Sequence, residues 1–268
     1  MNKVKDFSPL TFQEIMQKYR TPREKKLSWF RHIYRFLGVW ITKILLPTRV
    51  TPNQISFFAF FIGFPGVFLL LCQSYLLKLL AIFLIQFSFT LDFADGTLAR
   101  IKKLTSANGD YLDSTVNAII GSLFLFFTGL ANFHRIGLSG VVLGFSASFG
   151  FILIKFFYAM KLRSVVNIER NKVYEALSNS GTNSENDSVT DQSIRPDRQW
   201  IIRLEYVIWN YIYILNYLTL AFVFKLDYLA IIFYAISLPL YAFYVFYRLY
   251  KADLQETLDW IKNPDRCV

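Results

Sequence analysis

The sequence contains few of the residues that stabilise small secreted folds or bind soft metals. Of its 268 residues, two are cysteine and two are histidine. The cysteines, Cys72 and Cys267, do not suggest a disulfide framework. His32 and His134 are too far apart in the sequence to suggest a metal site. The first residues lack a short apolar block followed by small residues, so we expect no signal peptide.

Charged residues are also scarce, and acidic ones are the fewest. Asp, Glu, Lys and Arg make up 18% of the chain, with 29 basic and 19 acidic residues and a formal net charge of +10. No basic stripe lies outside the positions that flank apolar runs, which argues against a nucleic-acid partner. Because Lys and Arg gather on the cytoplasmic side of membrane proteins, we expect both termini to be cytoplasmic. The basic positions are Lys3 to Arg49, Lys102 with Lys103, Lys161 to Arg203, and the tail from Arg248.

Apolar residues, in contrast, are too abundant and too clustered for a soluble core. Hydrophobic residues make up 54% of the chain and aromatic residues 18%. A membrane-spanning helix needs roughly 20 mostly apolar residues. The runs are continuous rather than alternating, which favours helices over strands. We therefore predict an all-α membrane protein with about six transmembrane helices, near 55–72, 78–100, 110–132, 137–160, 205–224 and 228–248.

The predicted spans form one domain, residues 51–250, between an N-terminal segment (1–50) and a tail (251–268). Between the fourth and fifth spans the chain is rich in Ser, Asn and Asp. Such a composition cannot bury enough apolar surface to fold alone. We therefore expect a mobile cytoplasmic loop near 161–203.

A separate helix is predicted before the first span. The stretch "LSWFRHIYRFLGVWITKILL" (27–46) has apolar residues three or four apart with basic residues between them. This spacing predicts a cytoplasmic amphipathic juxtamembrane helix that lies in the membrane interface. Pro47 should end it, and Thr51 followed by Pro52 is typical of the start of the next helix.

Polar side chains interrupt the apolar runs at one place, "LDFADGTLARIKKLTSANGDYLDSTVN" (91–117). At about 100° per residue, Asp92 and Asp95 share a face at the end of the second predicted span. Asp113 and Asn117 share a face at the start of the third. Two oxygen-bearing helix faces can thus meet. Ala99 falls on the first face, with Gly96 and Arg100 alongside, and Asp110 falls on the second.

Carboxylates close to hydrocarbon are costly unless they are paired or bound to metal. A shared divalent cation would satisfy them, and oxygen-only ligands favour Mg²⁺, Mn²⁺ or Ca²⁺ over zinc. Gly96 would let a ligand approach the backbone closely, and Arg100 could bind a phosphate. The alternative is a set of helix-end charges paired with Arg100 and with Lys102 and Lys103.

These residues carry a family resemblance. The pattern resembles the signature of the CDP-alcohol phosphatidyltransferases, integral membrane enzymes that make phospholipids and related phosphodiesters. It matches at every fixed position but the last, where the family has a fourth Asp: Asp92-x-x-Asp95-Gly96-x-x-Ala99-Arg100, eight residues, Gly109-x-x-x-Asp113-x-x-x-Asn117. The stretch "TPNQIS" (51–56) is similar to the turn before the family's first span.

The resemblance implies a site and a reaction. Asp92, Asp95 and Asp113, with Asn117 at the fourth position, would bind Mg²⁺ or Mn²⁺ ions that hold the diphosphate of the donor. The donor would be a CDP-activated alcohol or CDP-diacylglycerol, and a polar or lipid alcohol would attack the phosphorus and release CMP. The pocket for cytidine and phosphate would be lined by Gly96, Ala99, Arg100 and Gly109. The resemblance further implies a homodimer among membrane lipids, and the absence of a targeting segment favours a bacterial cytoplasmic membrane.

Asp113 and Asn117 occupy the predicted catalytic positions, and Asn117 leaves the proton transfer open. An amide offers one oxygen to a metal but cannot accept a proton at neutral pH. Asp113, or Asp110 about two turns before Asn117, could take the proton instead. The acceptor oxygen could already be ionised, or the protein could bind a CDP-alcohol or its metals without turnover.

Other functions are open to a protein with acids near a membrane. A transporter would use them as proton or cation relays near the bilayer midplane and often has two related halves. Here the acids lie at one predicted edge, and no matching Gly- or Pro-broken segment stands in the second half. Lys155, in the fourth predicted span, could bind a substrate phosphate or reach to the interface.

Overall fold

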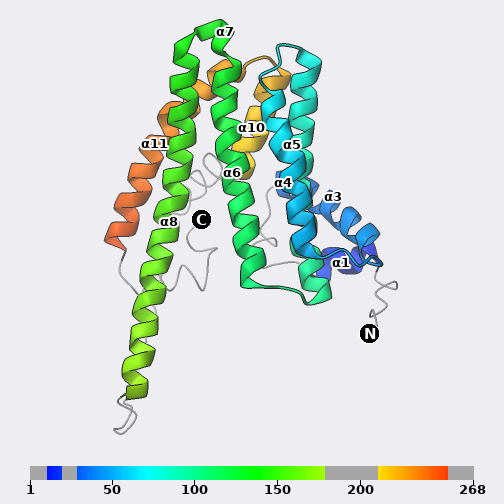
Figure 1. Cartoon of the computed structure of the whole chain (residues 1–268), viewed down its shortest axis with the longest axis vertical. Coiled ribbons are helices and arrows are strands. Elements are labelled where there is room, and N and C mark those ends of the chain that lie inside the picture. The colour runs from blue at the N-terminus through cyan, green and yellow to red at the C-terminus, as the bar shows by residue number, and fades with distance from the viewer. Residues whose placement is uncertain (1–10, 20–28, 179–210, 253–268) are drawn as a thin grey trace.

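The computed structural model describes residues 11–19, 29–178 and 211–252, and every regular element in these ranges is a helix (Figure 1). Five helices are long and apolar enough to cross a membrane. The prediction of an all-α membrane protein is therefore confirmed. The five helices are α4 (Pro52–Leu69), α5 (Tyr75–Lys102), α6 (Ala107–Ala131), α8 (Leu138–Ser178, of which 138–168 is the candidate span) and α11 (Asp227–Lys251).

The sixth predicted span corresponds to a shorter helix. Within the predicted range 205–224, the structure describes α10 (Tyr211–Val223), which is apolar but below the length of a full span. Residues 205–210 lie outside the described residues. Leu215 and Leu218 of α10 are fully buried, so this helix belongs to the core of the bundle.

The predicted loop near 161–203 is wrong for its first part, because α8 continues without a break to Ser178. Residues 161–178 contain neither proline nor glycine, so nothing in them stops a helix that is already formed. Lys161 Nζ also donates to the main-chain oxygen of Ala252, at 2.9 Å, and so joins α8 to the end of α11. Figure 1 shows α8 extending far beyond the ends of its neighbours. The rest of the predicted loop lies outside the described residues.

Close contact between α6 and α8 depends on glycine. A Cβ added to Gly129 would lie 2.4 Å from the oxygen of Gly140 and 2.5 Å from Cα of Gly144. Real side chains do not approach backbone atoms so closely, and only glycine allows the two helices to meet here. The contact fixes α8 beside α6, whose opposite end carries Asp113.

A buried polar group joins the helices at the other end of the bundle. Asn132, which ends α6, donates from Nδ2 to Asp227 Oδ2 at 2.7 Å, and Asp227 is the first residue of α11. Both side chains are buried. Arg135, in the short helix α7 (Phe133–Ile136), lies 3.6 Å from Asp227 Oδ1. The carboxylate is thus satisfied in an apolar bundle end, where an unpaired one would be costly.

Two helices precede the bundle. α3 (Trp29–Leu45) covers most of the predicted amphipathic segment, with Arg35 and Val39 buried and Trp40 and Ile44 exposed. α1 (Phe12–Lys18) lies beside it, and its Phe12 ring is 5.6 Å from that of Trp40. Both lie near the end of the bundle that holds the α5–α6 turn (Figure 1).

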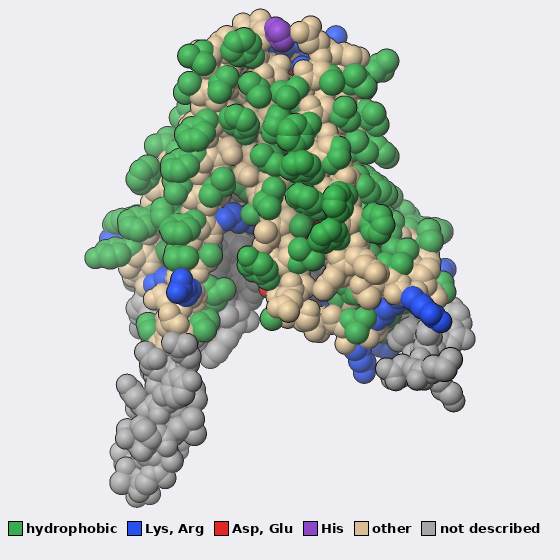
Figure 2. All heavy atoms as spheres, viewed as in Figure 1, with side chains coloured by type: hydrophobic (Ala, Val, Ile, Leu, Met, Phe, Trp, Pro, Cys, Tyr) green, Lys and Arg blue, Asp and Glu red, His purple; other side chains and the backbone are tan. Residues whose placement is uncertain are grey.

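The start of α4 agrees with its sequence signal. Thr51 is the N-cap: its side chain accepts from the backbone of Gln54, while the Gln54 side chain accepts from Thr51 N at 2.9 Å. Pro52 opens the helix, as predicted. Hydrophobic side chains cover most of the visible face of the bundle, as expected for helices that contact lipid (Figure 2).

Candidate functional site

The last turns of α5 and the first turns of α6 hold the polar residues that the sequence singled out. α5 ends at Lys102 and is capped by Lys103, which has a left-handed backbone (φ 56°); α6 begins after Ser106, whose hydroxyl accepts from Gly109 N at 3.0 Å. Because this connection is short, α6 runs back alongside the end of α5. Asp92 and Asp95 on one helix therefore face Asp113 on the other.

These carboxylates line one small cavity of about 10 Å³. All four residues that were predicted to bind metal line it, and residues of α4 contribute to the lining. Within the described part of the chain, the lining consists of Ser56, Ala59, Ser88, Asp92, Asp95, Asp113, Val116 and Asn117.

Asn117 joins carboxylates from two helices. Its Nδ2 donates to Asp92 Oδ1 at 2.6 Å and to Asp113 Oδ1 at 3.0 Å. Carboxylates accept hydrogen bonds, and the NH₂ end of the amide is the end that can donate to both. All three side chains are half-buried. The amide thus holds together two acidic groups that would otherwise repel each other.

Ser56 of α4 holds the third carboxylate. Its hydroxyl donates to Asp95 Oδ2, and both side chains are 5% exposed. Ser56 was not among the predicted site residues, although it closes the stretch "TPNQIS" that carried part of the resemblance. Its convergence with Asp95 depends on the packing of α4 against α5, which no local spacing indicates.

The other predicted site residues lie outside this cavity. Arg100 donates from Nε to the main-chain oxygen of Tyr19 at 3.1 Å, and from Nη2 to Thr97 Oγ1 at 3.3 Å. Gly109 lies in the first turn of α6 beside Asn53, and Asp110 is exposed. A Cβ added to Gly96 would fit without a clash, since its nearest neighbour, Arg100 Nη1, would lie at an ordinary contact distance of 3.6 Å. Ala99 is half-buried on the same helix.

A cation from a third helix acts on the acidic cavity. Lys155 of α8 lies within electrostatic range of Asp92 and Asp113. Its side chain is exposed, and its Nζ is 5.8 Å from the centre of the Phe151 ring. A positive charge therefore stands in range of two of the cavity's carboxylates.

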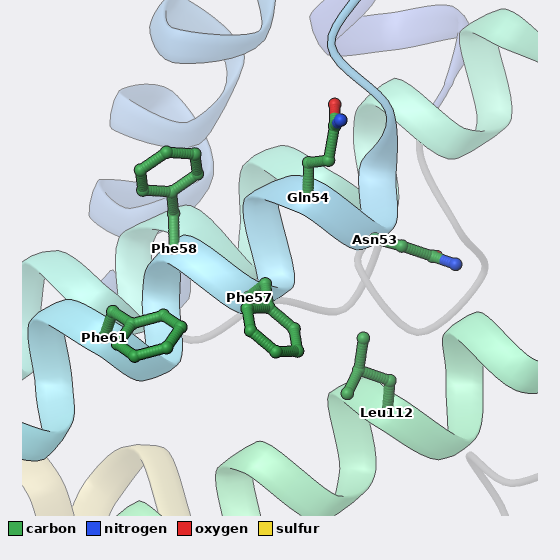
Figure 3. A pocket seen from close by; sticks show the side chains of 6 residues that line it. All are labelled: Asn53, Gln54, Phe57, Phe58, Phe61 and Leu112. Carbon is green, nitrogen blue, oxygen red and sulfur yellow. The ribbon is translucent and has the colours of Figure 1, made fainter.

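A larger apolar groove runs along the outer side of α4 and α6 (Figure 3). Its volume is about 520 Å³, and its walls are Asn53, Gln54, Phe57, Phe58, Phe61 and Leu112. Phe57 directly follows Ser56, and Leu112 directly precedes Asp113, so groove and cavity lie on different sides of the same two helices. The walls suit hydrocarbon rather than a nucleotide.

The donor atoms around the small cavity fit a hard divalent cation. They are mainly carboxylate and hydroxyl oxygens, which favour Mg²⁺ or Mn²⁺ over zinc. In the arrangement seen, no three His, Cys, Asp or Glu side chains of the described residues converge tightly enough to hold a metal ion. Asp95 turns to Ser56, while Asp92 and Asp113 turn to Asn117.

Fold and site together define a multi-pass membrane protein with a carboxylate cluster where two of its spanning helices meet. The family model for CDP-alcohol phosphatidyltransferase matches residues 49–177. Over this segment, which contains the whole cavity, the chain is similar to the CDP-alcohol phosphatidyltransferase family. Members of the family generally depend on divalent metal.

A curated relative matches the chain in part. The "Bifunctional IPC transferase and DIPP synthase" of Thermococcus kodakarensis is 34% identical over 96 residues. These residues are 35% of this chain and 21% of that protein, so the match spans about a fifth of the relative's length.

Proposed function

We propose that this protein transfers a phospho-alcohol or phosphatidyl group from a CDP-activated donor to an acceptor hydroxyl and releases CMP. The observation that carries the proposal is that Asp92, Asp95 and Asp113 line a single cavity within the family's segment. The relative named above, a transferase and synthase by name, supports the same reaction class.

In this proposal the cavity binds Mg²⁺ or Mn²⁺ through Asp92, Asp95 and Asp113, with Asn117 beside them. Divalent metal neutralises the oxygens of the transferred phosphoryl group and of the leaving CMP. The chain's own residues position that charge: Ser56 fixes Asp95, and Asn117 fixes the other two carboxylates. Lys155 would attract the phosphates of the donor from α8.

The substrate pocket would extend from the cavity past the residues of the motif. Gly96, which has no side chain, would let the donor's phosphates approach the helix backbone. Ala99 and Gly109 would line the cytidine side. Arg100 would serve here only by giving up its hydrogen bond to Tyr19 or by sharing it.

Asp113 is the group best placed to take the acceptor's proton. The acceptor oxygen bonds to the alcohol-side phosphorus, the bond from phosphorus to the CMP oxygen breaks, and the proton passes to a carboxylate oxygen of Asp113. Asp110 is exposed and outside the lining of the cavity, so its position does not support it as the base. A base contributes about 10²–10⁴-fold to such reactions.

We also propose a membrane topology and an oligomeric state. We place the N-terminal segment (1–50), the α5–α6 turn and the tail (251–268) in the cytoplasm, around the transmembrane domain 51–250, in a bacterial membrane and as a homodimer. A water-soluble nucleotide and a lipid could then meet at one edge of the bilayer. The groove lined by Phe57 and Leu112 would accept the hydrocarbon of a lipid substrate.

The test is release of CMP by the purified full-length protein in lipid nanodiscs. Mg²⁺ or Mn²⁺ is supplied with CDP-diacylglycerol or a panel of CDP-alcohols, each with mixed acceptor alcohols. We expect one donor–acceptor pair to release CMP, and Asp92→Asn to remove this activity. A folded native protein that binds CDP-alcohols but never releases CMP would contradict the transferase proposal and favour binding without turnover. The amide of Asn117, which cannot accept a proton, would be consistent with that result.

A further inference from the structure

We propose that, because of Asn117, the acidic cavity binds only one divalent cation until the CDP-linked donor binds. This inference rests on the proposed function, because it assumes that the acidic cavity binds divalent metal. Its basis is the amide nitrogen of Asn117, which lies 2.6 Å from Asp92 Oδ1 and 3.0 Å from Asp113 Oδ1. The amide thus engages an oxygen of each of two carboxylates that a second cation would need as ligands.

The space available favours a single ion. The cavity of about 10 Å³ is close to the smallest volume that can hold one water molecule, roughly 10–15 Å³. Two metal ions that act together lie roughly 3.5–4 Å apart. To bring a second ion between Asp92 and Asp113, the amide of Asn117 would have to turn and give up both of its hydrogen bonds. The third carboxylate, Asp95, is held on the other side by Ser56.

The charge balance favours the same number. Three carboxylates line the cavity; Lys155 lies within electrostatic range of Asp92 and Asp113, and Arg100 within range of Asp95. One divalent ion together with these two cations already offsets three ionised carboxylates. A second divalent ion would leave an excess of three positive charges close to the apolar core, which is costly. An Asp at position 117 would supply one more negative charge and remove the bridging donor.

It follows that the donor brings the charge that a second cation needs. A CDP-linked diphosphate is anionic, so its arrival would offset the excess and supply new oxygen ligands. Metal binding and donor binding should then be coupled in this protein: the first cation binds without the donor, and the second binds only with it.

The experiment is a titration of Mn²⁺ against full-length protein in zwitterionic nanodiscs, with free Mn²⁺ measured by electron paramagnetic resonance and no nucleotide present. We expect one bound Mn²⁺ per chain for the native protein and two for Asn117→Asp, with the second ion bound at least about tenfold more tightly than any second ion in the native protein. Asp110→Asn, which removes an exposed carboxylate outside the cavity, should leave the count unchanged.

Two equivalent ions in the native protein would overturn the proposal, and so would an unchanged count in a folded Asn117→Asp. If that variant does not fold, as judged by its melting temperature and elution volume, the native count still decides. No turnover is needed, so Mn²⁺ binding without CMP release would leave this inference standing while the transferase fails. Release of CMP by a native protein that binds two ions before the donor would support the transferase proposal and overturn this inference.

Discussion

The guanidinium of Arg100 donates from Nε to the main-chain oxygen of Tyr19, 3.1 Å away, across 81 positions of the sequence. Arg35 does the same for Met16, from Nη2 at 3.1 Å. Two arginines thus bind carbonyls at the end of α1, which have no partner within that helix. A residue of the motif therefore also anchors the N-terminal helix.

Arg100→Gln should loosen α1. Hydrogen bonds from charged groups contribute about 1.5–3 kcal/mol, so exchange of the protected amides in α1 should become at least about tenfold faster. Hydrogen–deuterium exchange of peptides from 11–19 measures this directly. Lys43→Gln, on the last turn of α3, is the matched control. Unchanged protection in Arg100→Gln would show that the other contacts of α1 suffice to hold it.

Asp113→Asn should lower kcat for CMP release by about 100-fold or more. The variant loses the proposed base and one ligand charge while it keeps the shape of the side chain. Asp110→Asn should stay within about threefold of the native rate, because Asp110 is exposed and outside the cavity. Rates of CMP release at saturating donor separate the two. A large loss of CMP release in Asp110→Asn, with a native rate in Asp113→Asn, would show that Asp110 takes the proton instead.

Two alanine substitutions should separate a substrate contact from a packing contact. Gly96→Ala adds a methyl group with 3.6 Å to its nearest neighbour and improves helix propensity, so stability should stay equal or rise by up to about 1 kcal/mol. Activity should nevertheless fall if the donor's phosphates approach Gly96. Gly129→Ala would collide with α8 and should cost about 1–3 kcal/mol. Unfolding and CMP release are measured on both. An equal loss of stability in Gly96→Ala would contradict the clash-free fit of a methyl group at this position.

Asn132→Ala should destabilise the bundle end by about 1–3 kcal/mol, because Asp227 would remain buried without that donor. Gln73→Ala is the control: it removes an exposed contact to His134 and should change stability by less than about 0.5 kcal/mol. Thermal unfolding in the same detergent compares the two. Similar melting temperatures for both variants would mean that water replaces the lost partner of Asp227.

The sequence predicted what depends on local pattern. Long apolar runs indicated five helices that the structure describes as long enough to span, and the helical spacing of Asp92 with Asp95 and of Asp113 with Asn117 placed each pair on one face. Residues 161–178 were misread because polar composition suggested a loop, although helix propensity and the contact at Lys161 continue α8.

Contacts that join distant segments could not be read from spacing. Ser56 meets Asp95 only because α4 packs against α5, and Arg100 was expected beside a phosphate but holds Tyr19. The direction of the Asn117 amide was also out of reach, since it depends on which acceptors the fold places around it.

The length of α8 gives this protein a rigid spacer. With 41 residues and a rise of 1.5 Å per residue, the helix is about 60 Å long, twice the roughly 30 Å of bilayer hydrocarbon. We therefore expect Ser178 to lie in water beyond the lipid headgroups, at a height that the length of the helix sets. A fluorescent label at Ser178 would report this height by energy transfer to a labelled lipid surface, and shortening α8 by one turn would lower it by about 5 Å.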